Sequence, residues 1–377
     1  MPANSICRFA FSLAFTLMTT GCLMSDAIAQ SLLSPEVHSD GRVTFRLRAE
    51  KATKAEISFG ETNVVPMSKN DKGVWEGTSE PLSPQIYDYT FKVDGTTMID
   101  PSNRWVKKWL TLASMVEIPG TPPRTTEFTD CPHGVVQRLI YRSSSVGHAR
   151  PVMIYTPPGY DSSSDTEYPL ILLLHGYGDD ENAWTDVGRA HLIADNLIAA
   201  GTMEPVIIVM PYGHPVPIEV GERPDGYFDG NNDLYEQDIT KDLLPFVEQK
   251  FHVRTDAAGR SIVGLSMGGG HALDTGLKNI DKFSSIGAFS AATSQLEGEA
   301  LLKQYPSLSG PDPAANALKH LWIPIGNKDF LLERNDKFVH QLKSAGIQHD
   351  YLKTEGGHEW KLWRDYLPQF LEMVAGK

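Results

Sequence analysis

The 377-residue sequence predicts an α/β fold preceded by a small all-β region. Apolar and polar residues alternate from about residue 41 to residue 100, which is the period of half-buried antiparallel strands. Later in the chain, continuous apolar runs such as YPLILLLHG and EPVIIVMPYG are typical of buried parallel strands. Helical patterns stand between these runs, so the simplest architecture is a parallel sheet with helices on both faces.

The first 29 residues predict a secretory signal. One arginine precedes an apolar run, and Ala27-Ile28-Ala29 supplies the small residues that signal peptidase recognises. We therefore expect cleavage near Ala29, followed by a secreted or periplasmic location. A lipid anchor on Cys22 is the alternative, and Thr19 disfavours it because lipoprotein signals usually carry leucine or a similar residue at that place.

Charge and composition exclude several classes of protein. The formal net charge is −13, which argues against a general nucleic-acid-binding surface. No apolar run after the signal approaches the roughly 20 residues that span a bilayer, so we expect no membrane span. The expected mature chain keeps only Cys131, and it therefore has no internal disulfide.

The all-β region is expected at residues 30–120, as a small β-sandwich. RVTFRLRA alternates Val43, Phe45 and Leu47 with polar residues, and IYDYTFKV has the same period. The dipeptide Asp94-Gly95 follows this second run and indicates a tight hairpin. The stretch PGTPPRTTEFTDCP is dense in Pro and Thr, which predicts a linker at 121–137 and an α/β domain at 138–377.

The α/β domain shows helical and strand patterns in turn. The runs SIVGLS, IGAF and HLWIPIG each lead towards a helical stretch. The segment DITKDLLPFVEQKF predicts a helix whose apolar face consists of Ile239, Leu243, Phe246, Val247 and Phe251.

The clearest chemical signal is Gly264-Leu265-Ser266-Met267-Gly268. It lies between the strand-like RSIVGLS and the helix-like MGGGHALDTGLKN. This context is that of a nucleophile elbow, in which a serine on a strained strand-to-helix turn projects its hydroxyl above the sheet. Ser266 is therefore the candidate nucleophile. A purely structural turn is the alternative, because glycine and serine are common residues.

A serine nucleophile needs a histidine to take its proton and an acid to orient that histidine. Hydrolases with this elbow carry the acid and then the histidine later in the chain. Asp329 follows the strand-like HLWIPIG and His358 follows HDYLKTE, so both are expected at the carboxyl ends of strands. Glu333 and Asp336 are weaker candidates for the acid, since they fall within a helical pattern that begins near Leu331. Asp329 could also cap that helix.

The run HGYG follows LILLL and can turn backbone N–H groups towards a negatively charged oxygen. The N–H groups of Tyr177 and Met267 are the candidate donors of this oxyanion hole. Gly176 and Trp360 are candidate contacts to the substrate. His175 precedes the nucleophile in the chain, so we expect it to hold the loop rather than to act as the base.

Other motifs do not indicate a cofactor. The stretch 229–233 begins like a calcium loop, but Leu234 stands at the required glycine position and Thr240 at the required glutamate position. We therefore expect a polar loop there. No Cys/His cluster suggests zinc, and GLSMGGG lacks the Lys-Ser/Thr ending of a phosphate loop. The sequence predicts neither a metal nor a cofactor.

Taken together, these motifs resemble those of the esterase D-like group of α/β-hydrolases, and within it the bacterial feruloyl esterases of carbohydrate esterase family one. The resemblance runs through HGYGDDENAW, RSIVGLSMGGGHALDTGLKN, IGNKD and EGGHEW, and it covers nearly all of 138–377. It implies an α/β-hydrolase fold. The Ser, Asp and His of the family match Ser266, Asp329 and His358.

The front region resembles the early-set, immunoglobulin-like module related to the carbohydrate-binding domain of glycogen-branching enzymes. The matching segments are DGRVTFRLRAEKA and KGVWEGTSEPLSPQIYDYTFKVDG. Trp75, Trp105 and Trp109 could stack on sugar rings, although Trp75 could equally belong to the core and WVKKW could pack against the α/β domain. A structural or substrate-positioning role is favoured over independent glycan binding.

The resemblance implies a secreted serine esterase that cleaves feruloyl or other hydroxycinnamoyl esters of plant cell-wall polysaccharides or oligosaccharides. Acetylxylan esterase and siderophore (enterochelin-type) esterase share the triad and stay as alternatives. A secreted carbohydrate-binding protein with an inactive hydrolase domain is the alternative from another class. The segment 211–237 is longer than in the xylanase-borne members, and it either walls the acyl pocket as a lid or is a surface insertion.

Overall fold

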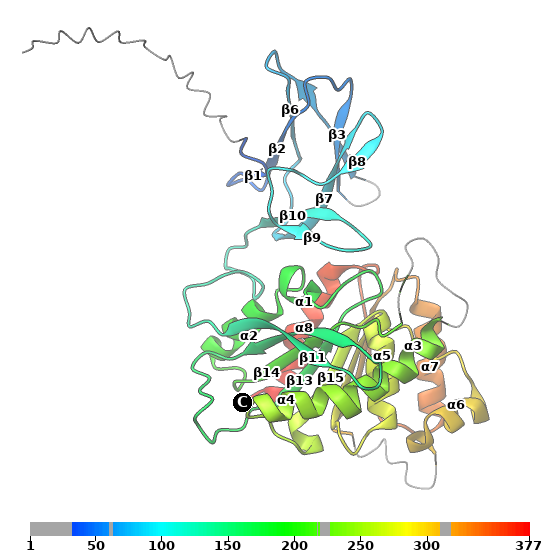
Figure 1. Ribbon diagram of the computed structural model, residues 1–377. Coiled ribbons are helices and arrows are strands. Elements are labelled where there is room, and N and C mark those ends of the chain that lie inside the picture. The colour runs from blue at the N-terminus through cyan, green and yellow to red at the C-terminus, as the bar shows by residue number, and fades with distance from the viewer. Residues whose placement is uncertain (1–31, 60–62, 217, 219–226, 310–317) are drawn as a thin grey trace, which may run out of the picture. The chain divides into compact units, whose positions relative to one another are not determined.

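The computed structural model describes residues 32–59, 63–216, 218, 227–309 and 318–377 (Figure 1). The expected signal at 1–29, with Cys22, lies outside the described residues. Within the described part of the chain, no helix has the length and apolar character that crossing a membrane requires. Residues 33–377 form one compact unit.

The N-terminal part of this unit consists of two antiparallel sheets. The first contains, in spatial order, β1 (Glu36–Val37), β2 (Val43–Arg48), β6 (Val74–Thr78) and β5 (Ser68–Lys69). The second contains β4 (Asn63–Pro66), β3 (Ala55–Phe59), β7 (Gln85–Val93), β10 (Ala113–Ile118) and β9 (Val106–Lys107), with β8 (Thr96–Met98) also paired to β7. Residues of both sheets share one apolar core, so the two sheets pack together.

The period of two places the apolar residues of these strands inside. Val43, Phe45 and Leu47 of β2 are all buried. The predicted hairpin is confirmed, because Asp94 and Gly95 have positive φ values of 46° and 91° and join the paired strands β7 and β8.

The three tryptophans of this region have different surroundings. Trp75 is buried in the core between the two sheets. Trp105 instead packs against the α/β region, since its Nε1–H donates to the carbonyl of Asp186 at 2.7 Å and the guanidinium of Arg189 lies 4.0 Å from its ring. Trp109 packs against the rings of Tyr212 and His214 at centroid distances of 5.9 Å and 5.0 Å.

An eight-stranded sheet forms the centre of the α/β region (Figure 1). Its spatial order is β11 (Val135–Arg142), β12 (Ala149–Thr156), β14 (Ile207–Pro211), β13 (Leu170–Leu174), β15 (Arg260–Leu265), β16 (Ser285–Phe289), β17 (His320–Gly326) and β18 (Asp350–Thr354). The strands from β14 to β18 are parallel, and β11 and β12 add an antiparallel edge. The parallel strands consequently end at one edge of the sheet, where α/β proteins place their sites.

Helices cover both faces of this sheet. One apolar core packs the sheet against α3 (Tyr227–Gln237), the π-helix η1 (Asp238–Leu243), α4 (Leu244–Lys250), α5 (Met267–Lys278), α6 (Gly298–Gln304) and α7 (Leu332–Ser344). A second core on the other face packs it against α1 (Ala183–Asp186), α2 (Ala190–Ala200) and α8 (Trp360–Ala375). Two short 3₁₀ turns, η2 (Ala257–Gly259) and η3 (Pro306–Leu308), complete the described elements.

The expectation of a polar loop at 229–233 is wrong, because these residues lie within helix α3. Tertiary contacts hold this helix. Asn231 is buried, and its amide contacts His271 Nε2 at 3.0 Å and the carbonyl of Gly213 at 3.2 Å. Tyr235 is also buried, with its ring 4.3 Å from that of His271. The last turns of the segment 211–237 therefore belong to the core, whereas residues 217 and 219–226 lie outside the described residues.

Candidate active site

Ser266 stands on the turn between strand β15 and helix α5. Its backbone has φ 54° and ψ −115°, a conformation that L-residues rarely adopt. Glycines make the turn possible, since a Cβ on Gly264 would lie 2.4 Å from the carbonyl oxygen of Gly268. A Cβ on Gly268 would lie 2.5 Å from the carbonyl oxygen of His175. The turn thus has the strained, glycine-packed geometry that the motif predicts.

The structure brings Ser266, His358 and Asp329 into one hydrogen-bonded row. The Oγ–H of Ser266 donates to His358 Nε2 at 2.9 Å. The Nδ1–H of His358 donates to the Asp329 carboxylate, whose two oxygens lie 3.0 Å and 2.9 Å away. This arrangement fixes the histidine tautomer with its free lone pair towards the serine.

Asp329 does not cap helix α7, whose N-cap is Leu331 with no side-chain capping bond. The buried carboxylate of Asp329 accepts the N–H of Leu331 at 2.8 Å, just before helix α7 begins. The alternative acids lie elsewhere: Glu333 pairs with Lys337, and Asp336 accepts from Tyr351.

The loop that carries His358 lies between β18 and α8. Gly356 has φ 131°, and a Cβ on Gly326 would lie 2.3 Å from its carbonyl oxygen, so the loop folds tightly over the end of β17. Two aromatic rings hold the imidazole: Phe330 at a centroid distance of 4.4 Å and Trp363 at 4.9 Å. Phe330 is 75% exposed, so it presents an apolar surface beside the histidine.

A second loop follows β13 and contains Gly176 and Tyr177. His175 anchors it from beneath, because its Nδ1–H donates to the carbonyl of Gly176 at 2.8 Å and its Nε2 accepts the N–H of Gly213 at 2.8 Å. Burial lowers the pKa of His175 to about 4, so its imidazole is neutral near pH 7. The expectation that His175 holds the loop agrees with these contacts. Met267, the other candidate donor, opens helix α5, where the first N–H groups have no partner within the helix.

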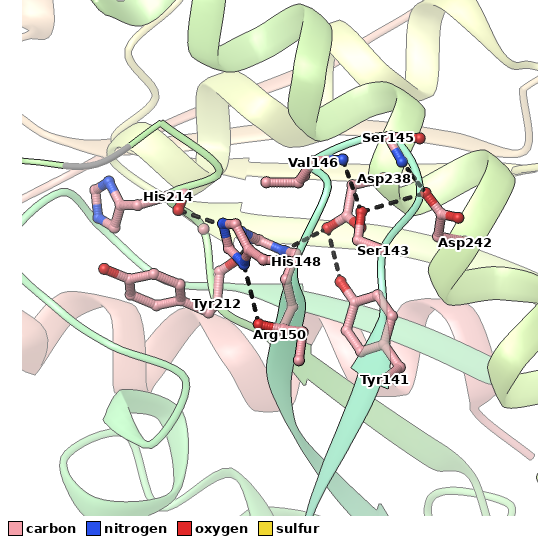
Figure 2. A network of polar contacts seen from close by, with 12 residues as sticks. Tyr141, Ser143, Ser145, Val146, His148, Arg150, Tyr212, His214, Asp238 and Asp242 are labelled. Carbon is pink, nitrogen blue, oxygen red and sulfur yellow. Dashed lines mark hydrogen bonds and ion pairs between the residues drawn. The ribbon is translucent and has the colours of Figure 1, made fainter.

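A buried polar network lies next to Gly213, the residue whose N–H binds His175 (Figure 2). Arg150 of β12 forms an ion pair with Asp238 of η1, with 2.7 Å between Nε and Oδ2. Tyr141 donates its hydroxyl to the same carboxylate oxygen at 2.6 Å. The other guanidinium nitrogens of Arg150 donate to the carbonyls of Tyr212 and His214, the two residues on either side of Gly213. No sequence motif marked this network.

A cavity of about 640 Å³ opens over Ser266. All the residues predicted from sequence except Asp329 line it together: Gly176, Tyr177, Ser266, Met267, His358 and Trp360. Trp360 is only 9% exposed, and its indole packs against Trp184 and Trp363. Sequence reasoning missed the opposite wall, which strands β7, β9 and β10 supply through Gln85, Ile86, Tyr87, Asp88, Lys107 and Met115.

Solved structures of two kinds share this architecture. A ferulic acid esterase is 26% identical and aligns with a TM-score of 0.55, over 64% of this chain and 98% of its own. The enterobactin esterase of Shigella flexneri is 19% identical and aligns with a TM-score of 0.65, over 93% of this chain and 97% of its own. The fold is that of an α/β-hydrolase.

The family follows from the sequence. A family model described as "Putative esterase" matches residues 143–374, so the chain belongs to this esterase family. An endo-1,4-beta-xylanase/feruloyl esterase of Xylanibacter ruminicola is 30% identical over 348 residues, which cover 90% of this chain and 46% of that protein. Esterase Rv1288 of Mycobacterium tuberculosis is 25% identical over 273 residues, which cover 59% of this chain and 55% of that protein. The chain therefore spans about half the length of these curated relatives.

Proposed function

We propose that Ser266, His358 and Asp329 are the catalytic triad of a serine esterase. Ser266 attacks the ester carbonyl while His358 takes its proton through Nε2, and Asp329 holds the imidazole and stabilises its positive charge. His358 then protonates the leaving alcohol, and it activates the water that hydrolyses the acyl-enzyme. The 2.9 Å contact between Ser266 Oγ and His358 Nε2 carries this proposal.

The proposed oxyanion hole consists of the N–H groups of Tyr177 and Met267. Both residues line the cavity beside Ser266, on the loop after β13 and at the first position of α5. The loss of one such donor typically costs about 3–4 kcal/mol of transition-state stabilisation. Gly176 and Trp360 are proposed to contact the acyl or alcohol part of the substrate.

The proposed substrates are feruloyl and other hydroxycinnamoyl esters of plant cell-wall polysaccharides. Two observations support an aromatic acyl group: the exposed ring of Phe330 beside His358, and the cavity volume of about 640 Å³. The similarity to the feruloyl esterase of Xylanibacter ruminicola and to the ferulic acid esterase structure supports the same chemistry.

We also propose a role for each segment of the chain. Residues 1–29 act as a signal for secretion or periplasmic export, with the anchor on Cys22 as the alternative. Residues 30–120 form an early-set, immunoglobulin-like module, 121–137 a linker and 138–377 the catalytic domain. The two-sheet core and the contacts of Trp105 support a module that packs against the catalytic domain and positions the substrate.

One set of rates tests the substrate assignment. Hydrolysis of methyl ferulate, acetylated xylan and a catecholate trilactone is measured side by side with one preparation of the enzyme. The proposal expects the highest kcat/KM on methyl ferulate. A higher value on acetylated xylan or on the trilactone would establish the acetylxylan or the siderophore alternative, and inactivity on every ester would favour a carbohydrate-binding protein.

A further inference from the structure

One wall of the active-site cavity comes from outside the segment that the esterase family model matches. That match begins at residue 143, whereas Lys107 lies on strand β9 of the N-terminal sheets. Lys107 is half-buried and lines the same cavity as Ser266 and His358. The same cavity is also lined by a buried carboxylate that the triad does not use.

That carboxylate is Asp179, which follows the oxyanion loop and is 6% exposed. Its Oδ2 lies 3.4 Å from the point that a Cβ on Gly176 would occupy, and the Cβ of Ser266 lies 3.6 Å from the same point. The carboxylate oxygen therefore lies within about 7 Å of the Cβ of Ser266. Burial raises its pKa to about 6, while the positive charge of Lys107 opposes this rise and the charge of Asp180 adds to it.

Lys107 and Asp179 face a shared space. Both line the active-site cavity, and both also line a small adjoining cavity. No ion pair within 4.0 Å joins these two described side chains, so a gap separates the ammonium group from the carboxylate. The next residue differs, because Lys108 is exposed and pairs with Asp186 at 2.8 Å.

Another cation beside the cavity already has its partners. Arg364 of α8 donates to the side chain of Gln85 and to the carbonyls of Ile86 and Val187, so it connects the N-terminal sheets to the catalytic domain. Lys107 is different, since its ammonium has three donors and faces the cavity without such contacts among the described residues. The cavity therefore has a hydrogen-bond donor, the Lys107 ammonium, and an acceptor, the Asp179 carboxylate, that do not contact each other.

We propose that Lys107 and Asp179 form a subsite that binds a hydroxyl group of the ester substrate. A hydroxyl group both donates and accepts, so one group can donate to the Asp179 carboxylate and accept from the Lys107 ammonium. The hydroxyl belongs either to the ring of an aromatic acyl group or to a sugar in the leaving alcohol. This inference rests on the esterase function proposed above, and it makes the N-terminal sheets part of the specificity of the enzyme.

The site should discriminate between esters with and without the hydroxyl group. An ester that lacks it leaves the buried carboxylate and the ammonium without a bridging partner, which a site built for hydrogen bonding strongly disfavours. Removing the Lys107 ammonium or the Asp179 carboxylate should therefore reduce the preference for the hydroxyl-bearing ester more than it reduces the rate on the ester without the hydroxyl.

Two pairs of esters test the subsite. Methyl 4-hydroxycinnamate is compared with methyl cinnamate, and feruloyl arabinose is compared with methyl ferulate, in each case by kcat/KM. The variants are Lys107→Met and Asp179→Asn, which keep the length and shape of the side chains, and Lys108→Met is the matched control. Circular dichroism checks that each variant is folded.

The wild-type enzyme should prefer the hydroxyl-bearing ester of one pair by about tenfold or more. Lys107→Met and Asp179→Asn should each abolish most of that preference, and Lys108→Met should keep it. A loss confined to the first pair identifies a phenolic hydroxyl, and a loss confined to the second identifies a sugar hydroxyl. If both variants keep the wild-type preference, or the wild type has none, the subsite is overturned while the proposed function stands. Inactivity on all four esters would overturn both.

Discussion

The Nε2 of His358 lies 2.9 Å from the Oγ of Ser266, although 92 residues separate them in the sequence. Strands β15 and β18 explain this contact, because they are parallel members of one sheet and carry the two residues just past their carboxyl ends. Each side chain is held independently, the serine by its strained turn and the histidine by Asp329 and two aromatic rings. The pair is therefore aligned before any substrate binds.

Replacing Asp329 with asparagine should remove the orientation of His358 and leave the fold intact. An amide can still accept the N–H of Leu331, but it favours the wrong histidine tautomer. We expect kcat on 4-nitrophenyl acetate to fall by about 10,000-fold, with little change in Tm. Asp336→Asn is the control, since that carboxylate accepts from Tyr351 and should not affect kcat. A loss below tenfold in Asp329→Asn would contradict the assignment.

The close packing behind Ser266 should not tolerate a methyl group. In Gly268→Ala, the new Cβ would meet the backbone of His175 at 2.5 Å and that of Leu174 at 2.6 Å, and neither can move aside easily. We expect a loss of about 1–3 kcal/mol in the free energy of unfolding, measured with urea. Gly178→Ala is the stability control, because its Cβ would meet nothing closer than 3.9 Å. Equal stability of the two variants would show that the turn is less constrained than this geometry implies.

These two predictions start from residues that the sequence already marked. The elbow around Ser266 is a local pattern of glycines between a strand and a helix, so a short window of sequence contains its whole signal. Asp329 and His358 follow from chain order and from their places after strands. Asp329 could not be assigned to one role, because a carboxylate in that place can either cap a helix or orient a histidine. Its contact to His358 is present, whereas the N-cap of α7 is Leu331.

The rest of the site depends on contacts between distant segments. Lys107 and Asp179 line one cavity from two regions of the chain, and no sequence motif connects the two regions. The helix at Asn231 was missed for the same reason, because its polar sequence predicts a loop until the amide is paired with His271 in the core. Propensity and spacing carry no information on such tertiary partners.

The effects of replacing Arg150 and Asp238 on the free energy of unfolding should be strongly coupled, because the two side chains form a buried ion pair (Figure 2). Arg150→Met leaves an uncompensated carboxylate in a fully buried place, which should cost about 3–5 kcal/mol of unfolding free energy. In the double variant, Asp238→Asn removes the uncompensated charge that Arg150→Met leaves. The double variant should therefore lose clearly less unfolding free energy than the two single variants lose together. Urea unfolding of the wild type, both single variants and the double variant measures the coupling. Additive losses would contradict it.

Asp179→Asn should stabilise the protein, and more so at high pH. Burial raises the pKa of Asp179 from its ordinary value of 3.8 to about 6, so the native state favours the protonated acid. The stabilisation that the protonated Asp179 contributes is fully present below pH 3.8, and it is lost as the pH rises through about 6. The ionised form consequently costs roughly 3 kcal/mol at pH 8, and asparagine avoids this cost. Urea unfolding at pH 4 and pH 8 checks the prediction, and a gain that is larger at pH 4 would refute it.

The central claim is that Ser266 is the nucleophile of an esterase, and one pair of rates tests it most directly. Hydrolysis of methyl ferulate is followed for the wild type and for Ser266→Ala, with Tm confirming that both are folded. We predict turnover by the wild type and a fall in kcat of about a million-fold, to near background, in the variant. Near-normal hydrolysis of methyl ferulate by Ser266→Ala would contradict the account.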